Sequence, residues 1–293
     1  MLISDSKNLD FTAHNRLFVI GCSFTKWIWP TWADIIAKEH PHLVYYNFGT
    51  GGCGNDYIFT MLNQITKEYN IGKGDMVLIM WSSFNRLSYY NTYEDSERLQ
   101  EAIINDDKKK TDKKDIRYST WSWNSSGDLV GSQVLDSPYT NCDRGFLLRD
   151  LAIIDTVATV MEQSAYTGAY MLSVAPDEQD IFDTTTPKTD NEDVFEFYKE
   201  VEEKQLGNRS LYNYLDYKQN NIVWDFPGPE VDYHPYSIQY YAFLRNIGIP
   251  LSKRVKEFCI FCDKIIDETT DSQYLEDSID WPYNFRSIEK YPL

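Results

Sequence analysis

Strand-like apolar runs that alternate with helical patterns constrain the fold of this chain more than any other feature of its sequence. Five such runs stand out, and the last of them has the weakest pattern. They cover residues 17–21, 43–48, 76–81, 169–174 and 222–226. The first, third and fourth runs are almost continuously apolar, which is typical of strands that are covered on both faces.

Helical patterns fill most of the sequence between these runs. They cover about 27–39, about 54–70, about 145–165 and about 235–247. Strands that alternate with helices predict a mostly parallel sheet whose crossovers are right-handed. We therefore expect an α/β fold, a three-layer α/β/α sandwich built on a five-stranded sheet.

Two long segments, about 88–144 and about 177–221, do not fit the alternation. Each follows the carboxyl end of a strand, where open α/β sheets bind ligands, so we interpret them as insertions at that edge. The expected organisation is one domain over residues 1–260, followed by an acidic extension over residues 261–293.

Charge and hydropathy narrow the possible partners and location. The formal net charge is -17, and acidic residues gather in 177–204 and 262–280. Nucleic acid and anionic membrane surfaces both select basic patches, so we expect neither as a partner. The N-terminal residues form no apolar signal segment, and no stretch reaches the roughly 18 apolar residues that a membrane span needs. These patterns predict a soluble protein without a signal peptide, either cytoplasmic or virion-associated.

The cysteines and the acidic segments indicate no metal or cofactor site. Five cysteines at irregular spacing do not resemble a disulfide framework. Cys259 and Cys262 form a lone CxxC, which lacks the second pair of a zinc site and the early βαβ context of a redox motif. We expect both as core thiols on one helix face. The acidic segments contain no EF-hand spacing.

Two polar segments follow the first two strand-like runs. Ser23 comes directly after Gly21-Cys22, where it would either cap the next helix or act as a nucleophile at the start of that helix. The glycine-rich segment 47–56 follows the second run and is either a flexible turn or a turn whose amides approach a ligand. It lacks the glycine spacing of a dinucleotide loop and the Gly-Lys-Ser/Thr of a phosphate loop.

Two more polar segments follow later runs. Ser83 and Asn85, after the third run, would either donate hydrogen bonds to an oxyanion or cap a helix. Asp232 and His234 lie two residues apart before a Pro-initiated helix. A carboxylate that orients a histidine, which in turn takes a proton from a serine, is the logic of a catalytic triad, whereas a surface histidine is the alternative.

In this order, the four segments resemble the SGNH (GDSL-like) hydrolase family, from about residue 16 to 247. The resemblance implies a flavodoxin-like sheet, with Ser23 as the nucleophile and Asp232 and His234 as its triad partners. It also implies that the backbone amides of Ser23 and Gly52 form an oxyanion hole. The third segment departs from the family pattern, because Ser83 stands where an asparagine is usual and Asn85 follows two residues later.

The resemblance implies a serine ester hydrolase that needs no cofactor or metal. Aromatic residues of the first insertion, Trp121, Trp123 and Tyr139, favour a carbohydrate ester over other small O-acyl esters, since sugar faces stack on such rings. The alternative is a catalytically weak or inactive SGNH-fold module with a binding or structural role. Such a module would be associated with a polysaccharide or with a virion, as in bacteriophages.

Overall fold

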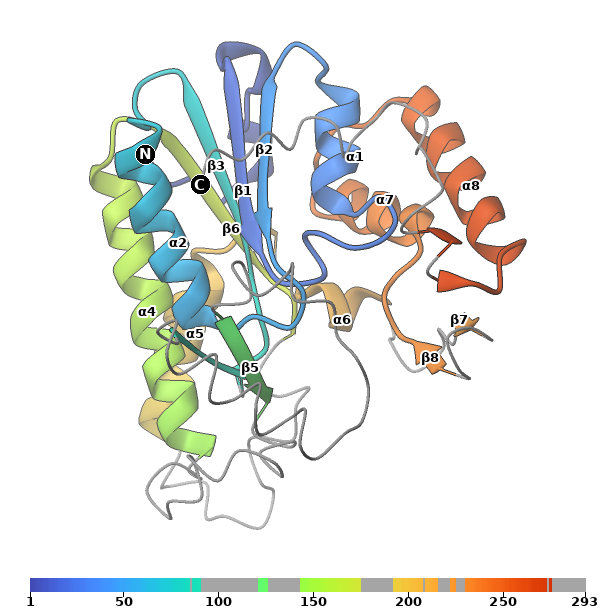
Figure 1. The fold of residues 1–293 in the computed structure, drawn as a ribbon. Coiled ribbons are helices and arrows are strands. Elements are labelled where there is room, and N and C mark those ends of the chain that lie inside the picture. The colour runs from blue at the N-terminus through green and yellow to red at the C-terminus, as the bar shows by residue number, and fades with distance from the viewer. Residues whose placement is uncertain are drawn as a thin grey trace.

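The structure is a computed structural model of the 293-residue chain (Figure 1). The described residues are 1–84, 86–90, 121–125, 143–174, 192–207, 209–215, 222–224, 230–272 and 274–275. Two short 3-10 helices, η1 (Ser6–Asn8) and η2 (Phe11–Ala13), precede the first strand.

A parallel sheet lies at the centre of the fold (Figure 1). In the part of the chain that is described it has four strands, in the order β2-β1-β3-β6. These are β1 (Arg16–Gly21), β2 (Val44–Gly49), β3 (Asp75–Trp81) and β6 (Thr167–Leu172). Gly21 pairs with Gly49 on one side and with Met80 on the other, so the segments that follow these strands start at one edge of the sheet.

Helices cover both faces of this sheet (Figure 1). One face carries α1 (Trp32–Glu39), α7 (Ser237–Asn246) and α8 (Lys253–Asp267), which pack against one another. The other face carries α2 (Asn55–Glu68), α4 (Asp143–Gln163) and α5 (Glu192–Glu203). The expected α/β fold with a parallel sheet between helices is therefore confirmed.

The predicted fifth strand is wrong for the described residues. The run at 222–226 yields only the three-residue strand β7 (Ile222–Trp224), which pairs antiparallel with β8 (Glu230–Asp232). A Pro-Gly-Pro sequence separates the two strands, and such a turn signal favours a local hairpin over entry into a parallel sheet. A second antiparallel pair is formed by β4 (Arg86–Tyr90) and β5 (Trp121–Ser125).

Both predicted insertions contain regular structure where they are described. β5 lies within 88–144, and α5 and α6 (Leu211–Leu215) lie within 177–221. The side chains of Val194 and Tyr198 on α5 are buried in the core, so this acidic segment also contributes an apolar face. α8 runs through residue 260, where the acidic extension was expected to begin.

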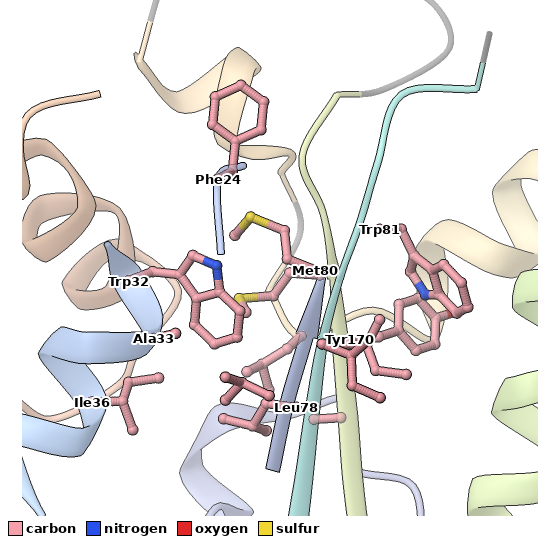
Figure 2. Packing of buried hydrophobic residues seen from close by; sticks show 14 of the residues in the cluster. Phe24, Trp32, Ala33, Ile36, Leu78, Met80, Trp81 and Tyr170 are labelled. Carbon is pink, nitrogen blue, oxygen red and sulfur yellow. The ribbon is translucent and has the colours of Figure 1, made fainter. Parts of the chain in front are cut away.

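The burial of the central strands explains why their sequences are apolar runs. Every residue of β3 is buried, because helices cover the sheet on both sides. Figure 2 shows Trp32 and Met80 on one side of the strand and Trp81 with Tyr170 on the other. Burying one such large side chain contributes about 1.5–3 kcal/mol. Cys259 and Cys262 are likewise 0% exposed on α8, which confirms that they are core residues of a helix.

Candidate active site

Ser23 lies in a tight turn at the carboxyl end of β1. The amides of Thr25 and Lys26 donate to the Cys22 carbonyl oxygen at 2.9 and 3.2 Å, which closes the turn. Helix α1 begins only at Trp32. The prediction that Ser23 lies at the start of this helix is therefore wrong, and the free amides of a helix N-terminus are not available to it.

Local sequence signals explain the late start of α1. Pro30 disfavours helical backbone at the residue before it, and Thr31 then serves as the N-cap. The Thr31 amide donates to Asp34 Oδ2 at 2.8 Å, and the Thr31 hydroxyl donates to the Thr25 carbonyl at 2.7 Å. Burial raises the pKa of the Asp34 carboxyl despite its hydrogen bonds from Thr31 and Tyr45. The residues between Thr25 and Thr31 consequently form a loop that is tied at both ends.

The glycine-rich turn after β2 lies against the end of β1. The Thr50 amide donates to the Gly21 carbonyl at 3.0 Å, and the Cys53 thiol contacts the same oxygen at 3.2 Å. Gly52 has a φ of 72°, a left-handed conformation that glycine adopts without strain. The turn that contains Gly52 is thus held next to the residue that leads into the Ser23 turn.

The amides of Ser23 and Gly52 lie at this edge of the sheet. Among the described residues, neither the Ser23 amide nor the Gly52 amide has a hydrogen-bond partner. Ser23 itself is 4% exposed. Unbonded amides next to a serine are the groups that an oxyanion hole requires, so these two remain the candidate donors.

Asp232 and His234 form a close hydrogen-bonded pair at the end of β8. Asp232 Oδ1 accepts from the His234 ring Nδ1 at 2.7 Å and from the His234 amide at 2.8 Å. The two side chains are 7% and 17% exposed, respectively. In the described part of the chain the other ring nitrogen, Nε2, makes no hydrogen bond. When Nδ1 donates to the carboxylate, Nε2 carries a lone pair and is able to accept a proton.

Aromatic side chains from the loop after Ser23 enclose the His234 ring. Trp27 stacks on it with ring centroids 3.7 Å apart and an interplanar angle of 19°. Phe24, the residue next to Ser23, contacts the ring at 5.2 Å, and Trp29 meets it edge-on at 6.3 Å. The Trp29 indole also donates to the Pro235 carbonyl at 2.9 Å. These contacts bring the histidine to the carboxyl end of β1.

No hydrogen bond joins Ser23 to His234 within the described residues. The two residues are neighbours through Phe24, whose ring packs against the imidazole. Serine–histidine contacts are often loose in proteins without substrate and tighten when substrate binds. The described contacts therefore place the Asp232–His234 pair against Phe24, the residue that follows Ser23.

The third predicted segment is described only in part. Ser83, 7% exposed, follows β3 at the same sheet edge. Asn85 lies outside the described residues, so the choice between Ser83 and Asn85 as a further oxyanion donor stays a prediction. Of the aromatic residues that suggested a carbohydrate ester, Trp121 and Trp123 lie in β5, and Tyr139 lies outside the described residues.

A buried polar network near the end of β3 was not predicted. Asn55, the first residue of α2, accepts from the Ser82 amide at 2.8 Å and donates to Asp150 Oδ2 at 2.8 Å. Arg149 pairs with Asp150 at 2.6 Å and donates to the Arg86 carbonyl at 2.7 Å. Burial outweighs this pairing and raises the pKa of the Asp150 carboxyl to about 7. The network fixes the start of α2, and with it the glycine-rich turn, to the end of β3.

Sequence patterns give little warning of these supporting residues. Trp27 bonds to a residue 205 positions away, and Asn55 bonds to one 95 positions away. The one available signal for the loop was its composition, since Phe24, Trp27 and Trp29 fall within seven residues of Ser23. In the described part of the chain no group of three or more His, Cys, Asp or Glu side chains is placed to hold a metal ion, and no helix is both long and apolar enough to cross a membrane.

No family model matches the sequence, and no curated protein matches it. Among solved structures, the chain is similar to a catalytic mutant of Axe2, an acetylxylan esterase from Geobacillus stearothermophilus. The two share 15% identity over 85% of this chain and 98% of that chain, with a TM-score of 0.41. A second catalytic mutant of Axe2 shares 14% identity over 87% of this chain and 100% of that chain, with a TM-score of 0.37. Values this low carry no conclusion about the activity of this chain.

Proposed function

We propose that the protein is a serine ester hydrolase of the SGNH (GDSL-like) type, with Ser23 as the nucleophile. The observation that best supports this proposal is the 2.7 Å hydrogen bond between Asp232 and His234 next to the Ser23 turn, with Nε2 unbonded among the described residues. A histidine oriented by a carboxylate and open at its second nitrogen is equipped to take a proton from a serine.

In the first half of the proposed reaction, Ser23 Oγ attacks the carbonyl carbon of an ester. Its proton passes to His234 Nε2 as the new bond forms, and the carbonyl π electrons move onto the oxygen. Asp232 stays ionised and stabilises the imidazolium. The amides of Ser23 and Gly52 would donate to the oxyanion, which is worth about 10²–10³ in rate for one donor.

The second half returns the enzyme to its starting state. The tetrahedral intermediate collapses, the alcohol leaves with the proton from Nε2, and an acyl group stays on Ser23. Water then attacks this acyl-enzyme while Nε2 takes one of its protons. The second intermediate breaks the bond to Ser23 Oγ, which recovers its proton from the ring, and a carboxylic acid is released.

The proposed substrate is a carbohydrate ester or another small O-acyl ester. Trp27 and Tyr212 are both partly exposed and lie around His234 and Phe24. Partly exposed aromatic side chains next to the proposed acyl-transfer site suit the apolar face of a sugar ring as well as a short acyl chain. Neither a metal nor an organic cofactor takes part in the proposed mechanism.

Hydrolysis of p-nitrophenyl acetate tests this proposal. We expect turnover by the wild type and its loss in Ser23→Ala and in His234→Ala. Ser173→Ala is the matched control, because Ser173 is another buried serine at this edge and its hydroxyl has no hydrogen-bond partner among the described residues. That variant should keep its activity within about twofold, since no described bond is removed.

A binding or structural module on the same fold is the second candidate. It is favoured by one observation, namely that Ser23 is 4% exposed and makes no described hydrogen bond to His234. A wild type that is folded but hydrolyses no ester would leave this candidate in place of the hydrolase. Circular dichroism of the same samples provides the check on folding.

A further inference from the structure

Trp27 contacts both members of the Asp232–His234 pair with different parts of its side chain. Its indole N–H donates to Asp232 Oδ2 at 3.2 Å, and its ring stacks on the imidazole at 3.7 Å. We propose that Trp27 is a positioning residue that holds the carboxylate and the imidazole in the geometry needed for proton transfer. The inference rests on the proposed hydrolase function of this site.

The indole N–H acts on the carboxylate. Asp232 Oδ1 already accepts two hydrogen bonds from His234, at 2.7 and 2.8 Å. The bond from Trp27 occupies the second oxygen, Oδ2. Rotation of the carboxylate about its Cβ–Cγ bond would break bonds at both ends, so Oδ1 stays directed at Nδ1. A fixed Oδ1 selects the tautomer in which Nδ1 carries the hydrogen and Nε2 accepts.

The indole face acts on the imidazole. A stack at 19° and 3.7 Å covers one face of the His234 ring and opposes rotation of that ring out of the plane of the carboxylate. The ring becomes a cation when it takes the proton of Ser23, and an aromatic face attracts a cation. One side chain therefore stabilises the anion through its N–H and the transient cation through its π face.

Trp27 is itself held by the site's other parts. It meets Trp29 edge-on at 6.1 Å, and Trp29 is anchored to the Pro235 carbonyl at 2.9 Å. A Cβ added to Gly51 would lie 3.9 Å from Cζ3 of Trp27, so the indole lies near the glycine-rich turn. Trp27 therefore contacts the Asp232–His234 pair from a position near the glycine-rich turn.

Two substitutions at Trp27 separate these two effects. Trp27→Phe keeps an aromatic face and removes the N–H, and we expect kcat to fall about tenfold, the value of one charge-assisted hydrogen bond. Trp27→Leu removes both contacts, and we expect a fall of about 30- to 100-fold. KM for p-nitrophenyl acetate should stay within about twofold in both variants, since the residue positions the proton-transfer groups.

A ring spectrum gives a readout that does not depend on turnover. The ¹⁵N shifts of the His234 ring, assigned by comparison with His234→Ala, report which nitrogen carries the hydrogen. We expect one Nδ1–H tautomer in the wild type and a mixture of tautomers in Trp27→Leu. Trp81→Phe is the matched control, because its indole N–H has no described hydrogen-bond partner and its ring packs on Tyr170.

The ring spectrum decides the proposal. A tautomer mixture in Trp27→Leu, with the wild-type spectrum in Trp81→Phe, upholds the role of Trp27, even if the wild type shows no turnover and the hydrolase proposal fails. A His234 spectrum in Trp27→Leu identical to that of the wild type overturns it, whatever the activities.

Discussion

Asp232 and Asp150 both carry buried carboxyl groups near the carboxyl edge of the sheet, yet they bind different kinds of hydrogen-bond partner. Asp232 is 8% exposed and accepts hydrogen bonds from the His234 amide, the His234 ring and the Trp27 indole. Asp150 is 0% exposed and is bound by Arg149 and Asn55. The Asp232 carboxyl orients the His234 ring, whereas the Asp150 carboxyl accepts hydrogen bonds from a guanidinium and a side-chain amide.

The two carboxyl groups differ in the further hydrogen bonds that their partners make. His234 keeps its Nε2 unbonded among the described residues, so a proton accepted there changes the charge of the pair. Asn55 and Arg149 are bonded onward to the backbone of Ser82 and Arg86. Proton transfer needs a nitrogen that is not already hydrogen-bonded, whereas a purely structural network has its polar groups bonded to one another. On the proposed function, Asp232 takes part in the chemistry, whereas Asp150 supports the glycine-rich turn through Asn55.

Replacement of Asp232 by asparagine should give the largest effect. In Asp232→Asn the amide no longer selects the Nδ1–H tautomer, and we expect kcat to fall about 10⁴-fold with the fold retained. The comparison is Asp75→Asn, a 4% exposed carboxylate bound by Arg16 at the opposite edge, which should lose stability and keep kcat within about twofold. Steady-state hydrolysis of p-nitrophenyl acetate measures both. Equal losses in the two variants would contradict the division of roles.

Removal of the Asp150 carboxyl should mainly affect stability. Asp150→Ala removes the carboxyl that Arg149 and Asn55 both bind, and we expect the free energy of unfolding to fall by about 3 kcal/mol. Asp155→Ala on the same helix is the control: its ion pair with Lys204 is 36% exposed on both sides and should be worth at most about 1 kcal/mol. Urea unfolding monitored by tryptophan fluorescence measures the difference. A smaller loss in Asp150→Ala than in Asp155→Ala would refute the scaffold role.

The pH dependence of stability sharpens the same comparison. Burial raises the pKa of Asp150 to about 7 from 3.8, so the folded state keeps a proton that the unfolded state has released. This contribution to stability is complete below the unfolded pKa and is lost as pH rises through about 7. Relative to Asp150→Asn, the wild type should lose about 1.6 kcal/mol between pH 5.5 and 7. Parallel stability curves for the two proteins would show that Asp150 does not titrate in this window.

Substitution of Gly52 tests whether the glycine-rich turn, which the Asp150 network supports, contributes to the proposed catalysis. Its φ of 72° is strained for any residue with a Cβ, by about 1–2 kcal/mol. In Gly52→Ala we expect the candidate oxyanion amide to shift and kcat to fall about tenfold. Gly74→Ala carries the same backbone strain at a φ of 88°, with its nearest neighbour at 3.5 Å, and should lose stability alone. If both glycine variants keep full activity, the Gly52 amide is not an oxyanion donor.

The fold was predictable where one physical signal dominates. Strands β1 and β3 are covered on both faces, so their sequences are continuously apolar and stand out without any structure. β7 did not follow this rule, since its apolar residues pair within a short hairpin. Pro30 and Thr31 are sequence signals for the late start of α1. The apolar residues before them, however, continued the helical pattern, so the helix was predicted to begin too early.

The candidate site was predictable only for residues that are close in the sequence. Asp232 and His234 are two positions apart, and their pairing is local. The bond from Trp27 to Asp232 spans 205 positions, and the bond from Asn55 to Asp150 spans 95. Such contacts depend on how the strands and loops assemble in space, and no periodicity or motif in one sequence encodes them.

Fluorophosphonate labelling of Ser23 tests the central claim most directly. The probe is attacked by a serine whose proton is taken by a neighbouring base, and mass spectrometry of the digested protein locates the adduct. We predict an adduct on Ser23 in the wild type, none in His234→Ala, and none on Ser173 in either protein. A folded wild type that carries no adduct, or carries it on another serine, would contradict the assignment of Ser23 and His234 as nucleophile and base.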